Sequence, residues 1–92
     1  MLRKFIIERE IPDIGSKRPE DYCAIARKSN EVLDGLGKGI QWVESYVADN
    51  KTYCVYLAED ESLIREHARR SGFPADRIVE IRTMLDPTTA AS

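Results

Sequence analysis

Features that would mark a membrane protein or a secreted protein are missing from this sequence of 92 residues. No apolar run approaches the ~20 residues that a helix needs to span a bilayer. The opening stretch "MLRKFIIERE" has only a short apolar run before charged residues follow, which is not the pattern of a signal peptide. We therefore expect no membrane partner and a cytoplasmic location.

Cysteine and histidine are scarce: the chain has Cys23, Cys54 and a single histidine, His67. The cysteines form no CxxC pair and have no histidine at zinc-finger spacing, so free thiols are expected in a reducing compartment. Phosphate-binding glycine loops and the HExxH and GxSxG motifs are also absent. Lys and Arg number 14 against 16 Asp and Glu, a net charge of −2 that argues against a nucleic-acid partner.

The composition, 42% hydrophobic and 33% charged, is that of an ordinary folded domain. We expect one domain over residues 1–86 and a flexible C-terminal tail over 87–92. A chain of this length buries a modest core, so pairing of two subunits is a plausible source of further stability.

Hydrophobic periodicity and turn residues divide the domain into six elements. Strands are expected over residues 2–10, 40–47, 51–58 and 76–85, and helices over 19–35 and 61–71. Pro19 is suited to a first helical position, Asp60 to an N-cap, and Gly72 to a helix stop. The order β-α-β-β-α-β predicts an α+β, ferredoxin-like fold, with a four-stranded antiparallel sheet and two helices on one face.

Strand alternation indicates what covers the other face of this sheet. A two-residue turn at Asp49–Asn50 divides the hairpin between two faces. One face carries Trp42, Glu44, Tyr46, Tyr53, Val55 and Leu57; the other carries Val43, Ser45, Val47, Thr52, Cys54 and Tyr56. Both faces are partly apolar, which predicts a second subunit on the open face and a homodimer of the dimeric αβ-barrel type.

His67 lies on the inward stripe of the second expected helix, with Leu63, Ile64, Ala68 and Ser71. An imidazole there is either a packed core group or a functional group, a metal ligand or a general base. The aromatic side chains Trp42, Tyr46 and Tyr53 are likewise either packing residues or the lining of a pocket. Ser29 faces inward from the first expected helix and joins the candidate pocket.

The stretches "KSNEVL", "GIQWVESYV" and "KTYCVYLAEDESLIREHARRSGFPADRI" together resemble a family of short bacterial proteins of unknown function. One characterised member of that family is described as nickel-binding. The resemblance implies a ferredoxin-like subunit that pairs into a dimer and sequesters nickel. Tyr53, Cys54 and His67 are the positions that match. Relatives often read "WxHSYV" where this chain reads "WVESYV", so Glu44 replaces an imidazole with a harder donor and weakens any preference for nickel.

Three functional hypotheses remain open from the sequence. The first is a small metal-binding protein whose donors are His67, Cys54 and Glu44, with nickel or another divalent transition metal as the ligand. The second is a cofactor-independent enzyme or small-molecule binder that uses a pocket around His67. The third is a dimerisation module in which His67 only packs. A cavity of several hundred Å³ beside His67 would favour the second.

Overall fold

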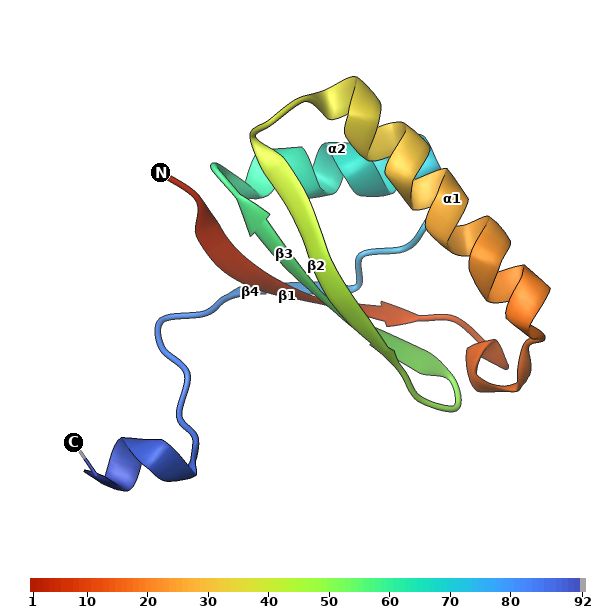
Figure 1. Cartoon of the computed structure of the whole chain (residues 1–92). Helices are drawn as coiled ribbons and strands as arrows, with labels where there is room; N and C mark the ends of the chain where they lie inside the picture. Colours follow the sequence, from red (N-terminus) through yellow and green to blue (C-terminus); the bar gives the residue numbers. More distant parts are fainter. Residues whose placement is uncertain (92) are drawn as a thin grey trace.

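The computed structural model describes residues 1–91, which form a single sheet covered on one side by helices (Figure 1). The elements in chain order are β1 (Arg3–Glu10), the 3-10 helix η1 (Ile14–Ser16), α1 (Pro19–Leu36), β2 (Ile40–Val47), β3 (Lys51–Ala58), α2 (Glu61–Ser71), β4 (Arg77–Glu80) and the 3-10 helix η2 (Pro87–Ala91). The strands are antiparallel in the order β2-β3-β1-β4. The predicted ferredoxin-like α+β fold is confirmed.

The core lies between the central strands and α2, because alternate residues of each strand point to the helices. Phe5 and Ile7 of β1, Tyr56 of β3 and Ile64 of α2 are all at most 3% exposed. Burial of each such side chain contributes roughly 1.5–3 kcal/mol relative to an exposed one. The two central strands therefore carry the largest share of the hydrophobic stabilisation.

The helix ends follow the local signals in the sequence. Pro19 is the first residue of α1, and Asp60 caps α2 by accepting a hydrogen bond from the backbone N–H of Ser62 at 2.9 Å. Gly72 ends α2 with φ at 80°, a left-handed conformation that glycine adopts without a steric penalty. These three predictions are confirmed.

The hairpin of β2 and β3 contains an irregularity that the sequence analysis missed. Tyr46 faces Tyr53 and Glu44 faces Val55 as predicted, but a β-bulge between Trp42 and Glu44 shifts the rest of the register. Trp42 therefore pairs with Tyr56 and lies on the helix-covered face, where the prediction had it on the open face. The extra residue of a bulge reverses the alternation of every residue beyond it.

The last strand is shorter than predicted: β4 spans Arg77–Glu80, where 76–85 was expected. Phe5 of β1 pairs with Glu80, and the N–H of Ile81 donates to the carbonyl of Lys4. Since β1 begins at Arg3, the residues beyond Ile81 soon have no residue of β1 left to pair with. The chain then leaves the sheet as an arm (Figure 1).

The end of this arm was predicted to be a flexible tail, 87–92. Residues 87–91 form η2, a short helix that the pattern did not indicate, and residue 92 lies outside the described residues. Flexibility of the tail stays a prediction. Among residues 1–91, no helix has both the length and the apolar character to cross a membrane.

Candidate functional site

A cavity of about 460 Å³ lies between α1 and the helix-facing side of the sheet. Most of its wall is apolar, and strands, η1, α1 and the turn after α2 all contribute to it. The apolar lining includes Ile11, Ile14, Ile25, Trp42 and Phe73, and the polar lining includes Arg9, Ser29, Ser45 and Thr52. This size lies within the roughly 300–1,000 Å³ typical of small-molecule pockets.

One end of the cavity is held in place by contacts between η1 and two other elements. The hydroxyl of Tyr22 on α1 donates to the carbonyl of Ile14 at 2.7 Å, and the N–H of Gly15 donates to the carbonyl of Asp49 at 2.9 Å. A Cβ atom on Gly15 would clash with the backbone of Ala48. Glycine is needed here because it lets η1 approach the β2–β3 turn closely and bring Ile14 against the cavity.

His67 is fully buried, as its place on the helical stripe predicted. Its Nε2 atom lies 3.1 Å from the hydroxyl oxygen of Ser29, and its ring packs against Tyr56 at a centroid distance of 5.3 Å. Its other nitrogen, Nδ1, has no hydrogen-bond partner among residues 1–91. Ser29, Tyr56 and Phe73 stand between the imidazole and the cavity, so His67 lies directly behind the cavity wall.

The surroundings of His67 keep the imidazole uncharged at neutral pH. Burial lowers the pKa of His67 to about 4; the positive charge of Arg9 acts in the same direction, and the hydrogen bond with Ser29 opposes it. Burial also raises the pKa of Tyr56, although contact with Ser29 and the charge of Arg9 partly offset that rise. The interior beside the cavity is therefore electropositive because of Arg9.

Arg9 is a site residue that the sequence analysis overlooked. It is only 3% exposed, and its Nη1 donates to the carbonyl of Pro74 at 2.6 Å, while Nη2 is buried and has no partner among residues 1–91. A signal for it was present in the sequence. Phe5, Ile7 and Arg9 alternate along β1, and a period of two places all three on the core face.

The structure separates the three predicted metal donors. His67 and Cys54 are both buried on the helix side, and the nearest recorded partner of the Cys54 thiol is the hydroxyl of Thr52 at 3.7 Å. Glu44 lies on the open face beside Tyr46, whose hydroxyl donates to its carboxylate. No three His, Cys, Asp or Glu side chains within residues 1–91 come together as a metal-binding group.

The predicted pocket residues divide in the same way. Trp42 and Ser29 line the cavity, Trp42 because of the bulge. Tyr46 and Tyr53 face each other across the hairpin on the open side, where they are 58% and 39% exposed. Sheet alternation thus places these two tyrosines away from the cavity, which corrects their assignment as part of its lining.

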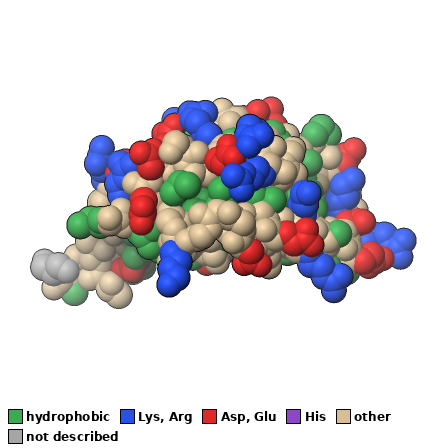
Figure 2. Space-filling model, turned by 90° about the horizontal axis from the view of Figure 1, so that it is seen from above, with side chains coloured by type: hydrophobic (Ala, Val, Ile, Leu, Met, Phe, Trp, Pro, Cys, Tyr) green, Lys and Arg blue, Asp and Glu red, His purple; other side chains and the backbone are tan. Residues whose placement is uncertain are grey.

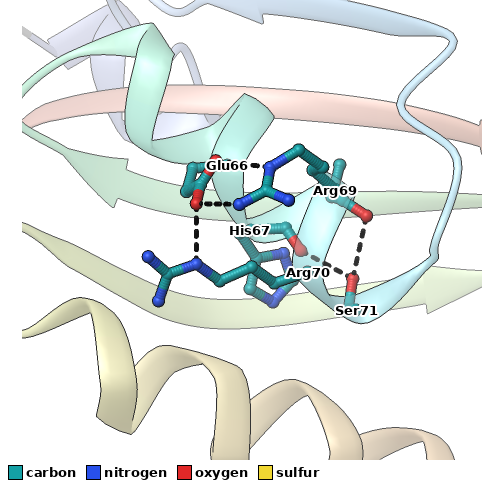
Figure 3. Close-up of polar contacts among 6 residues, drawn as sticks. Glu66, His67, Arg69, Arg70 and Ser71 are labelled. Atoms are coloured by element: carbon teal, nitrogen blue, oxygen red, sulfur yellow. Dashed lines mark hydrogen bonds and ion pairs between the residues drawn. The ribbon is translucent and has the colours of Figure 1, made fainter.

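The outer face of α2 carries a network of ion pairs. The carboxylate of Glu66 accepts hydrogen bonds from Arg69 and Arg70, which lower its pKa to about 2 (Figure 3). Figure 2 shows acidic and basic side chains intermixed over the helix side of the molecule, with no histidine visible. These exposed pairs contribute little to stability individually. They mark this face of α2 as solvated surface, on the side away from the cavity.

The fold and the cavity define a class of protein, a small ferredoxin-like α+β domain with a mostly apolar cavity between its helices and its sheet. Residues 5–81 match the family described as "Nickel responsive protein SCO4226-like", and the chain belongs to this family. It is similar in fold to the crystal structure of SCO4226 from Streptomyces coelicolor A3(2). That match has a TM-score of 0.70 and 17% identity, covering 89% of this chain and 99% of the other. Comparison with curated proteins gives no match.

The depressed pKa of His67 predicts a pH dependence of stability. Unfolding frees the imidazole to regain its ordinary pKa near 6.5, so the unfolded chain binds more protons between pH 6.5 and 4. The free energy of unfolding should fall by roughly 2 kcal/mol between pH 7 and pH 5. Urea unfolding of the wild type at both pH values measures this change.

The control for this measurement is His67→Gln, which keeps a neutral hydrogen-bonding group opposite Ser29 but has no proton to gain. Its free energy of unfolding should vary much less over the same range. Glu66, with its pKa near 2, contributes only at lower pH. A wild-type dependence no steeper than that of the variant would contradict the burial of a neutral imidazole.

Proposed function

We propose that this protein binds a small, largely apolar molecule in the cavity between α1 and the sheet. The observation that carries this proposal is the cavity itself, at about 460 Å³ with a mostly apolar wall. A concave space of this size with mostly apolar walls is typical of small-molecule sites. A ligand that fills it would cover apolar surface and gain contacts with the wall.

Binding accounts for the site better than nucleophilic catalysis does. Ser29 and His67 are within hydrogen-bond distance, the first requirement for an activated hydroxyl. In nucleophilic pairs, however, a third group orients the imidazole, and Nδ1 of His67 has no partner among the described residues. Ser29 therefore serves as a polar contact at the cavity wall, and His67 holds it in place.

A cavity-filling substitution tests this proposal. Ala26 lines the cavity from α1, so Ala26→Phe should fill the space and weaken binding of a neutral apolar probe, octanamide, by at least about tenfold. Trp42 is the only tryptophan and lies in the wall, so its fluorescence reports binding without a label. Calorimetry with the same probe gives an independent affinity.

Ala24→Phe is the matched control, because Ala24 lies on the same helix but is exposed to solvent. This variant should bind octanamide as the wild type does. Equal binding of octanamide by Ala26→Phe and the wild type would rule out the cavity as the ligand site.

Nickel binding is the second candidate function, and the description of the family supports it. In this chain the residues do not fit a three-donor site: Glu44 lies on the open face, while His67 and Cys54 are on the covered face. The charge of Arg9 near His67 also disfavours a second cation there. Of the three predicted donors, only His67 and Cys54 lie on the same side of the sheet.

Calorimetric titration with nickel separates these donors. If the interior pair binds the metal, His67→Ala should abolish the heat of binding, and Glu44→Ala should leave it unchanged because its carboxylate is on the opposite face. Circular dichroism of each variant confirms that it is folded. A wild-type signal no larger than that of His67→Ala would end the proposal that His67 is a nickel ligand.

We also propose that a second copy of this chain covers the open face of the sheet. Tyr46 and Tyr53 are exposed there, and Ile6, Val55 and Leu57 are only half-buried. Alternation places all five on the same face, where they form an apolar strip among charged residues. An isologous contact between two such strips would bury both strips against each other, and neither strip would stay exposed for a third copy of the chain.

Tyr53→Glu tests the dimer. A carboxylate within the strip would be desolvated on pairing, so the dissociation constant should rise at least about tenfold. Sedimentation velocity over a range of concentrations measures it, with Ala24→Glu on the solvated face of α1 as the control. A wild type that sediments as a monomer at high concentration would refute this pairing.

A further inference from the structure

The guanidinium group of Arg9 lies in the wall of the cavity without a negative partner. The Arg9 side chain is only 3% exposed, and none of the ion pairs among residues 1–91 includes it. Its Nη1 donates to the carbonyl of Pro74, and its carbon Cζ lies 6.0 Å from the centre of the Tyr56 ring. Neither contact supplies a negative charge.

Burial of an unpaired guanidinium group destabilises the folded protein when no ligand is bound. Arginine stays protonated, so it cannot escape burial by releasing its proton as a lysine or histidine can. Buried charges in proteins are normally paired with an opposite charge. Here Nη2 has no hydrogen-bond partner among residues 1–91, although its side chain borders an open cavity.

Several other polar groups in the wall are engaged within the protein. Tyr22 donates to the carbonyl of Ile14, Trp42 donates to the hydroxyl of Ser45, and Ser29 bonds to His67. Arg9 differs from these neighbours because it is the charged residue of the lining, and its buried Nη2 has no hydrogen-bond partner among residues 1–91. A ligand with one anionic group would meet a single defined anchor and apolar surface elsewhere.

We propose that the ligand of this cavity is a carboxylate on an apolar body, with the carboxylate bound to Arg9. This inference rests on the proposed function, since it names the chemical class of the molecule that the cavity binds. The guanidinium fork matches the geometry of a carboxylate, and charge-assisted hydrogen bonds are stronger than those between neutral groups.

The residues of the cavity wall also disfavour other classes of ligand. A phosphate dianion needs several donors, whereas Arg9 is the one charged side chain in the lining of this mostly apolar space. A cation would be repelled by Arg9, which already acts to lower the pKa of His67. A neutral apolar molecule would fill the volume but leave the charge unpaired.

A matched pair of probes tests the inference at pH 7: octanoate and its neutral amide, octanamide. Their flexible chains are the same, so the difference in affinity isolates the carboxylate. Octanoate should bind the wild type roughly 10–100-fold more tightly than octanamide does, as expected for a hydrogen bond to a charged group. Calorimetry and Trp42 fluorescence both measure this ratio.

Variants assign the preference to Arg9. Arg9→Gln should abolish the preference and bring the ratio near one, and Arg9→Lys should retain part of it because the charge remains. Arg77→Gln removes an arginine whose side chain is 71% exposed, and should leave the ratio unchanged. If Arg9→Gln does not fold, the ratio in the wild type and in Arg9→Lys still decides the question.

The outcomes separate this inference from the function on which it rests. Equal affinity for octanoate and octanamide in the wild type would overturn the carboxylate class but leave a cavity that binds apolar molecules. Binding of neither probe would overturn both. Displacement of octanoate by inorganic phosphate at similar concentration would also overturn the carboxylate class, because the site would then recognise phosphate.

Discussion

The buried contact between Ser29 and His67 joins α1 to α2 above the sheet, and the rest of the interior depends on it. Both side chains are at most 4% exposed, and the contact pairs the Ser29 hydroxyl with Nε2 of His67, while Nδ1 has no partner among residues 1–91. Core packing involves Ile64 of α2 and the central strands, and the cavity lies on the other side of the contact.

The electrostatic character of the interior comes from one strand. Arg9 follows Phe5 and Ile7 on the core face of β1, so the strand that supplies the hydrophobic core also carries a guanidinium to the cavity wall. That charge disfavours protonation of His67, and burial does so more strongly. The result is a neutral imidazole behind the wall and a cation within it, a combination suited to an anionic ligand more than to a metal dication.

Part of the site was accessible from the sequence. The helical stripe placed His67 and Ser29 inward, and both are buried. The alternation of β1 would have placed Arg9 inward by the same rule, but a charged residue near the end of a strand is easily assigned to solvent. Trp42 was beyond such reasoning, because the β-bulge after it has no signal in "IQWVES" and reverses its face. Glu44 was grouped with His67 by chemistry alone, and the sheet lies between them.

The sequence by itself determined the element order and most element ends, since periodicity, proline, glycine and capping residues act locally. It also determined which stripe of each helix is apolar. The tertiary structure alone decided the bulge, the short β4, the position of η1 at one end of the cavity and the burial of Arg9 without a negatively charged partner among residues 1–91. Each of these depends on contacts between segments far apart in the chain, and local side-chain preferences do not specify such contacts.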